Sequence, residues 1–250
     1  MRRKQIVVAS LILSAIDISG VVFFFLQSTR EPVYQGKPLS VWLKGYDTSN
    51  MEELFKNNCA KLHELDKILS QVGTNAIPTL LQLLREEDFK GHDIHSNGNE
   101  ASNGFRALGV NAKDAVPSLT KIYEQNPAAR ADVLYSLGCI GPAAEGAVPW
   151  LLKKLTDTNG KERAWIVDAL GQIHAQSALV VPVLINCLDD SNSKVRVDAA
   201  LALGEYGTDA KPAVPVLIDL LNDKGKGVKN STTLALKMID PEAAVKAGLK

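Results

Sequence analysis

The chain has few aromatic residues, few cysteines and no excess of either charge. Phe, Trp and Tyr make up 6% of its 250 residues, while 46% are hydrophobic, a balance that suits packed helices better than a sandwich or barrel. Lys plus Arg and Asp plus Glu number 28 each, so nothing indicates nucleic acid, whose binders carry a basic excess on one face. Cys59, Cys139 and Cys187 form no paired spacing. We expect them to be small apolar core residues rather than disulfides or metal ligands.

Motifs that bind phosphate or activate a nucleophile are absent from the sequence. There is no P-loop, no G-x-G-x-x-G turn and no Ser-His-Asp spacing. His92 and His95 lie in a polar stretch, residues 91–99, without an adjacent third metal ligand. We interpret this stretch as a solvated insertion, with partner contact as the alternative. The sequence therefore predicts no catalytic residue, no metal ion and no cofactor.

An apolar segment, residues 6–26, follows a basic N-terminus. At about 1.5 Å per residue it is roughly 31 Å long, which matches a hydrocarbon core of about 30 Å. Asp17 near its middle costs about 2.5–3.5 kcal/mol, and the surrounding Ile, Val, Leu and Phe residues offset this at about 0.3–0.6 kcal/mol each. The segment is longer than the apolar region of a signal peptide and lacks a small-residue cleavage site. Residues 1–28 are therefore predicted to be an uncleaved signal anchor, with cleavage as the alternative.

The basic residues before this segment should stay in the cytoplasm. This predicts a single-pass protein of the cytoplasmic membrane, with the rest of the chain on the outer, periplasmic side. Residues 29–50 are expected to be a linker and capping segment, since Pro32, Gly36 and Pro38 favour an extended chain. Ser40 can cap a short helix. Trp42 on that helix is expected to cover the open end of the first repeat.

Three elements recur at a spacing of 33 residues: an arginine, a Leu-Gly pair, and a Val-Pro pair. The arginines are Arg130, Arg163 and Arg196, the Leu-Gly pairs begin at residues 137, 170 and 203, and the Val-Pro pairs begin at residues 148, 181 and 214. A fixed period of this length is typical of stacked helical hairpins. Two less regular units precede these, and a half-unit follows. Residues 51–250 are thus predicted to form an all-α, right-handed α-solenoid of five hairpins and a terminal half-unit.

These units resemble HEAT repeats of the bacterial phycobilisome-lyase-like type, with the pattern R-x-x-A-A-x-A-L-G-x-x-G followed by A-V-P-x-L-x-x-L-L-D. The resemblance covers roughly residues 60–245. The leader E-P-V-Y-Q-G-K-P-L-S-V-W-L is similar to that of membrane-anchored HEAT-repeat proteins of Verrucomicrobia-type bacteria. The resemblance implies a scaffold without catalytic residues. Its alternative implication is a lyase-like factor that attaches or removes bilin chromophores.

His63-Glu64 resembles one His-Glu step of the HEAT-type iron hydroxylase that acts on deoxyhypusine, a family that builds its di-iron site from four such steps. No other histidine of this chain precedes a glutamate. We therefore expect His63 to be an ordinary helical residue.

Acidic residues also recur with the period. Asp157, Asp190 and Asp223 each precede a basic residue by six positions. An Asp at a helix start can cap free N–H groups, while the basic residue can reach an acid of a neighbouring unit. We predict a row of structural ion pairs along the stack, with a ligand-binding row of arginines as the alternative.

The second helix of each hairpin is expected to line the concave side and to contact a protein or peptide partner. The expected contact residues directly follow each proline or lie three residues further on: Ser118, Lys121, Trp150, Lys153, Val183, Asn186, Val216 and Asp219. Trp150 stands out because exposed Trp is favoured at interface hot spots; the alternative is that it packs against the next unit. The expected function is that of a membrane-anchored, non-catalytic interaction scaffold.

Overall fold

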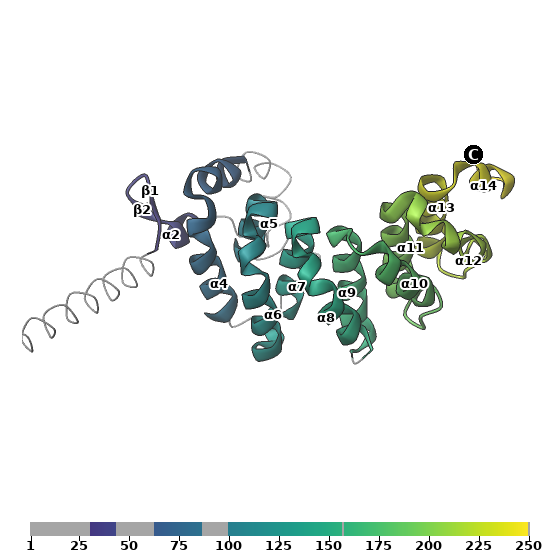
Figure 1. Ribbon diagram of the computed structural model, residues 1–250, viewed down its shortest axis with the longest axis horizontal. Coiled ribbons are helices and arrows are strands. Elements are labelled where there is room, and N and C mark those ends of the chain that lie inside the picture. The colour runs from purple at the N-terminus through teal and green to yellow at the C-terminus, as the bar shows by residue number, and fades with distance from the viewer. Residues whose placement is uncertain (1–30, 44–62, 87–99, 157, 250) are drawn as a thin grey trace, which may run out of the picture.

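The computed structural model describes residues 31–43, 63–86, 100–156 and 158–249 of the chain, and its helices stack side by side in chain order (Figure 1). Residues 63–72 are helical and form the first hairpin with α4 (Ile77–Glu86). The next hairpins are α5 (Glu100–Leu108) with α6 (Val116–Gln125), α7 (Arg130–Ile140) with α8 (Val148–Leu155), α9 (Gly160–Ile173) with α10 (Ser177–Cys187), and α11 (Ser193–Tyr206) with α12 (Val214–Leu220). The terminal half-unit is α13 (Lys226–Ile239) followed by α14 (Pro241–Lys246). This arrangement confirms the predicted helical solenoid.

No helix in the described ranges has the length and apolar character needed to cross a membrane. The predicted anchor, residues 1–28, lies outside those ranges, as does the polar stretch at residues 91–99. The anchor therefore stays a prediction.

Glycines with a positive φ angle end the first helix of most hairpins. They are Gly73, Gly109, Gly141 and Gly207, with φ between 49° and 68°, a region in which glycine carries no steric cost. Each opens a short 3-10 segment: η2 (Gly73–Ala76), η3 (Gly109–Ala115), η5 (Gly141–Ala147) and η6 (Gly207–Ala213). The Val-Pro pair then places proline in the first turn of α6, α8 and α12, where its missing N–H has no helical partner to lose.

The hairpin of α9 and α10 departs from this pattern. His174 and Gln176 adopt positive φ angles of 47° and 52°, and α10 already begins at Ser177, so Pro182 lies inside the helix instead of opening it. The single hydroxyl proton of Tyr206 lies within reach of two carbonyl oxygens, those of Ala175 (2.9 Å) and Leu170 (3.2 Å). Its ring packs edge-on against His174, with centroids 4.9 Å apart. The following unit therefore stabilises a turn that lacks the glycine of its neighbours.

The glycine of each Leu-Gly pair lies where consecutive first helices touch. A Cβ atom on Gly171 of α9 would come within 3.0 Å of the Ala202 Cα atom in α11, and one on Gly204 within 3.2 Å of the Ala235 Cα atom in α13. Ordinary Cβ contacts are wider than this, so the absence of a side chain allows the close approach. Gly171 and Gly204, each eight residues after a repeated arginine, thus determine how closely the first helices pack.

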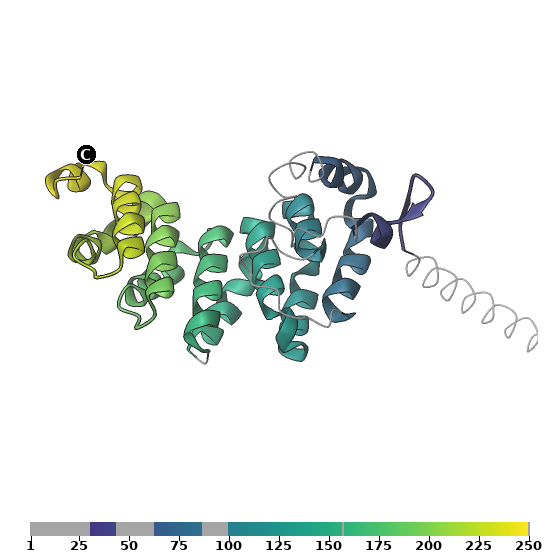
Figure 2. The same ribbon diagram turned by 180° about the vertical axis from the view of Figure 1, so that it is seen from behind.

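Neighbouring first helices pack closely from α5 to α13, whereas neighbouring second helices touch one another little. Figure 2 shows the same order of helices from behind. The first helices therefore form the tighter row of the stack. The expected placement of the second helices on the concave side stays a prediction.

The segment before the repeats forms a small β-hairpin instead of an extended link. Strand β1 (Val33–Tyr34) pairs antiparallel with β2 (Lys37–Pro38), and α2 (Leu39–Leu43) follows directly. The backbone N–H of Ser40 donates to the Glu31 carboxylate, so the acceptor at this helix start is Glu31 and not the Ser40 side chain. Leu39 and Leu43 are fully buried in the core.

Trp42 contacts this hairpin. Its indole N–H donates to the Tyr34 carbonyl oxygen at 2.9 Å, and its ring stands edge-on to that of Tyr34. Trp42 also packs against the apolar core. It therefore joins the N-terminal segment to the stack.

Candidate partner-binding surface

Two of the repeated arginines form ion pairs with the aspartate in the loop that follows their own hairpin, and not with an acid of a neighbouring unit. Arg163 makes two hydrogen bonds to the Asp190 carboxylate, at 2.8 and 3.0 Å, and Arg196 makes two to Asp223, at 3.0 and 3.2 Å. A remaining guanidinium nitrogen of each arginine donates to a carbonyl oxygen, that of Thr158 or of Asp190. The predicted ion-pair row is thus confirmed for these two arginines, since their donors are directed within the stack.

The same prediction also made aspartates the helix caps and included Asp157 in the row. Asparagine, not aspartate, caps the first helices: the Asn159 side chain accepts from the N–H groups of Lys161 and Glu162, and that of Asn192 from Lys194. Asp190 instead accepts from the N–H of Asn192 at 2.8 Å, which orders the loop before the cap. Asp157, the third acidic residue of the row, lies outside the described ranges.

The ion pairs should make stability depend on pH. Hydrogen bonding from Arg163 lowers the pKa of Asp190, and that from Arg196 lowers the pKa of Asp223. A carboxylate with a lowered folded-state pKa stabilises the fold above its unfolded pKa of about 3.9, and this contribution is lost as the pH falls through the lower folded value. We expect Asp190→Asn to weaken the protein at pH 7 but to lose less further stability than wild type between pH 5 and pH 2. Urea unfolding at several pH values measures this.

The control for this experiment is Asp209→Asn. Asp209 is exposed and forms no ion pair in the described part of the chain. Its variant should keep the wild-type pH dependence. Equal pH dependence in Asp190→Asn and wild type would contradict the assignment.

Trp150 packs within the stack, but against the preceding unit and not against the next unit as the alternative expected. Its ring stands edge-on to that of Tyr123, with centroids 4.8 Å apart, and its indole N–H donates to Glu124 at 3.1 Å. The Lys154 ammonium group lies 2.7 Å from the same carboxylate, and this hydrogen bond lowers the pKa of Glu124. Trp150 remains half-buried, so part of its ring can still contact a partner.

Tyr123 connects this contact to a buried carboxylate. Its hydroxyl donates to Glu162, which is 6% exposed, and the Arg130 guanidinium lies 3.3 Å from the same carboxylate oxygen. Burial, followed by the bond to Glu162, raises the pKa of Tyr123. The sequence pattern did not predict Glu162 as the partner of Arg130, because the period pointed to Asp157.

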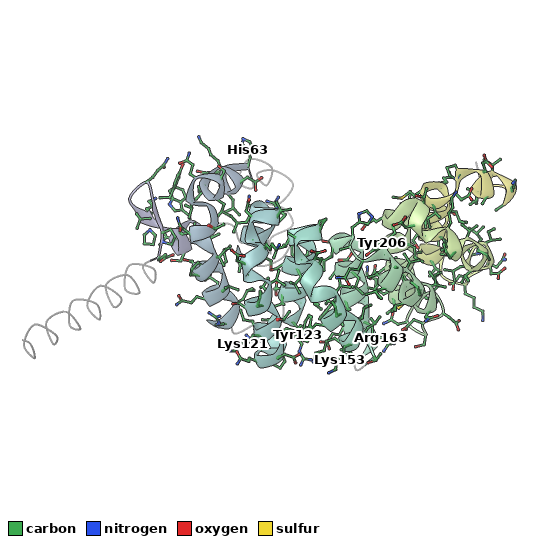
Figure 3. All side chains as sticks on the ribbon, in the orientation of Figure 1. His63, Lys121, Tyr123, Lys153, Arg163 and Tyr206 are labelled. Carbon is green, nitrogen blue, oxygen red and sulfur yellow. The ribbon has the colours of Figure 1, made fainter. Side chains whose placement is uncertain are left out.

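The other expected contact residues lie on separate helices along the second-helix row. Lys121, Lys153, Asn186, Val216 and Asp219 are exposed, and Ser118 and Val183 are half-buried. Figure 3 shows Lys121 and Lys153 along one edge of the stack, near Tyr123. The structure brings these residues to one row without linking them, and their contact with a partner stays a prediction.

A second row of accessible side chains lies on the first helices, and we call it the first-helix ridge. It consists of the residues five and nine positions after each repeated basic residue: Tyr135 and Cys139, Asp168 and Gln172, Leu201 and Glu205, Leu234 and Met238. Unlike the Leu-Gly positions, these vary from unit to unit. That variation was the signal in the sequence that could have identified the ridge.

The cysteines and His63 mostly match their expected environments. Cys187 is buried, and burial raises the pKa of its thiol to about 11. Cys139 is half-buried, with a pKa that burial also raises. Cys59 lies outside the described ranges. His63 is exposed on a helix, and no group of three metal-binding side chains occurs among the residues that the structure describes.

Comparison with solved structures gives three similar chains. Two are engineered proteins, each 21% identical to this chain, with TM-scores of 0.45 and 0.44; each comparison covers 83% of this chain, and 61% and 96% of the other. The third is a designed armadillo repeat protein in complex with the peptide (KR)4, 16% identical with a TM-score of 0.42, covering 80% of this chain and 98% of the other. This chain thus spans less than two thirds of the first engineered protein.

Comparison of the sequence with protein families and curated proteins gives one family. No curated protein matches. The family model for HEAT repeats matches residues 148–237, which run from the start of α8 into α13 and contain both arginine–aspartate pairs. The chain therefore carries HEAT-type repeats, shown for residues 148–237.

Proposed function

We propose that this protein is a membrane-anchored, non-catalytic scaffold whose HEAT-type repeats hold a protein or peptide on the outer side of the cytoplasmic membrane. One observation carries the proposal: the side chains that recur with the period are used inside the stack. Arg163 and Arg196 pair with the aspartates in the loops after their own hairpins, and Gly171 and Gly204 allow close helix contact. The positions left for a partner are those that differ between units.

The membrane part of the proposal rests on the apolar segment 6–26 and the basic residues before it. A fusion of alkaline phosphatase to the C-terminus measures the orientation, because this enzyme is active only where disulfides form. We expect activity, together with retention in the membrane fraction after alkaline washing. An inactive fusion would contradict the outward orientation, and release by the wash would contradict the anchor.

Proximity labelling in the native cell tests the scaffold. A labelling enzyme fused to the full chain should mark a set of proteins that the same enzyme fused to residues 1–50 alone does not. The double variant Lys121→Ala/Lys153→Ala reports on the second-helix row, since both residues are exposed. If the full chain and the residue 1–50 fusion mark the same proteins, the scaffold proposal fails.

Absorbance and metal analysis distinguish the scaffold from the lyase-like alternative. We expect the full chain, purified from its native cell, to show no visible absorption band and less than stoichiometric iron. A bound chromophore, or iron at one equivalent or more, would favour the alternative and overturn the scaffold.

A further inference from the structure

The first-helix ridge changes character along the stack. At its centre, on α9 and α11, it carries the carboxylates Asp168 and Glu205. Toward the C-terminal end, on α11 and α13, it carries Leu201, Leu234 and Met238, which are 37%, 49% and 48% exposed. Exposed apolar side chains that adjoin one another on packed helices often mark a contact surface.

Asp168 on α9 and Glu205 on α11 both lie near Gly171, and the charge of Asp168 acts on Glu205. The Glu205 Oε2 atom lies 3.2 Å from where a Cβ of Gly171 would be, and Asp168 precedes Gly171 by one helical turn. Asp168 accepts a hydrogen bond from Gln172 at 2.8 Å. Glu205 makes no hydrogen bond or ion pair within the described ranges. A cation placed between the two carboxylates would therefore be attracted by both.

Positive groups of the chain itself lie near this pair but are directed elsewhere. The Lys194 ammonium lies 2.6 Å from Asp198 on the same helix. Burial raises the pKa of Asp168, and the charge of Lys194 opposes this shift. The pKa of Glu205 is also raised, by burial and then by the neighbouring Asp168, with His174 opposing. Burial is thus the first cause of both raised pKa values, and the second negative charge adds to it at Glu205.

The geometry points to a docking surface for a peptide segment of a partner protein that carries Lys or Arg beside leucine-like side chains. Its basic residue would lie between Asp168 and Glu205, and its apolar residues would cover Leu201, Leu234 and Met238. Charge complementarity selects this occupant, because an acidic segment would meet the two carboxylates Asp168 and Glu205. This inference rests on the proposed scaffold function and assigns its contact surface to the first helices.

The spacing of the helices limits the length of the segment. Packed helices lie about 8–10 Å apart, so α9 to α13 span about 20 Å. An extended chain rises about 3.3 Å per residue. We therefore expect the basic residue and the last apolar residue to be about six positions apart.

Selection from a random 12-residue peptide library displayed on phage tests this docking surface. The bait is the full 250-residue chain in mild detergent. Enriched peptides should carry Lys or Arg within about six positions of Leu, Ile, Met or Phe. Fluorescence anisotropy with the best peptide should show binding about tenfold weaker in Leu234→Ser and in Glu205→Gln.

The matched control is Ile218→Ser, because Ile218 is 38% exposed, close to the 37% of Leu201, but lies on the second helix α12. Its affinity for the peptide should equal that of wild type. The docking surface is overturned if no peptide is enriched, if enriched peptides lack a basic residue, or if Leu234→Ser binds as wild type does. If the selected peptides bind wild type but not Lys121→Ala/Lys153→Ala, the contact surface lies on the second helices. The scaffold function would still stand. The scaffold itself is tested separately, by the labelling experiment and by the absorbance and metal analysis.

Discussion

Replacing Gly171 with alanine should lower the free energy of unfolding by about 1–2 kcal/mol. The new methyl group would lie 2.8 Å from the Ala202 Cβ atom and 3.0 Å from its Cα atom, and a backbone atom can move away only if the helices separate. Overpacking of this kind typically costs about 1–3 kcal/mol. The intrinsic preference of a helix for alanine over glycine, about 0.5–1 kcal/mol, offsets part of that cost. Urea unfolding followed by circular dichroism measures the difference.

Gly138→Ala is the control, because Gly138 is the equivalent residue one unit earlier. There the methyl group would meet the Gln172 side chain, at 2.6 Å from its Oε1 atom, and this flexible amide can rotate away. The variant should be as stable as wild type, or up to about 1 kcal/mol more stable through helix preference. If Gly138→Ala and Gly171→Ala have the same stability, backbone contact between first helices does not limit the packing.

Trp150→Ala should lower the free energy of unfolding by about 2–3 kcal/mol. The substitution removes the edge-on contact with Tyr123 and the hydrogen bond to Glu124. Replacing a fully buried Trp by Ala costs about 3–5 kcal/mol, and the half-exposed ring of Trp150 should cost less. Thermal and urea unfolding of the full chain measure the loss.

Lys153→Ala serves as the control for Trp150, since Lys153 is exposed on the same helix. A surface substitution of this kind should change stability by less than about 0.5 kcal/mol. The comparison decides how a change in binding is interpreted, because a partner lost with Trp150→Ala alone could reflect weaker packing. Equal stability of the two variants would mean that Trp150 contributes no packing energy to the stack.

The repeating part of the fold could be predicted from the sequence because its period reflects contacts that recur. The separation of 27 residues between Arg163 and Asp190 returns between Arg196 and Asp223, and each pair joins the first helix of a hairpin to the loop after its second helix. The same regularity misled where one unit differs. The partner of Arg130 in the described ranges is Glu162, a residue on the following first helix. A periodic pattern does not indicate with which of two nearby acidic residues an arginine will form its ion pair.

Local exceptions could not be predicted for a related reason. Pro182 has the same sequence neighbours as the prolines that open helices, yet α10 begins five residues before it. The turn before α10 depends on Tyr206, which belongs to the next unit. The capping carboxylate of Glu31 likewise reaches Ser40 across a hairpin of two residues per strand. Contacts of this kind become visible only when the chain is placed in space.

The first-helix ridge could be predicted only in part. Both helices of a hairpin carry an apolar face and an accessible one, so periodicity alone treats the two rows of helices alike. Variation between units marks Leu201, Glu205 and Leu234 in the sequence. The close contact of the first helices at Gly171 and Gly204, in contrast, becomes visible only in the packing.

The short separation along the chain of the residues that pair affects how fast the chain can fold. Arg163 and Asp190 are 27 residues apart, and the helices that pack together belong to the same or adjacent hairpins. Closing such short loops loses little chain entropy, and folds dominated by near-neighbour contacts form rapidly. Any hairpin of the stack can then serve as a nucleus, with growth in both directions. We expect refolding from urea to be complete within milliseconds to seconds, and the ends of the stack to exchange amide hydrogens before α9 and α11 do.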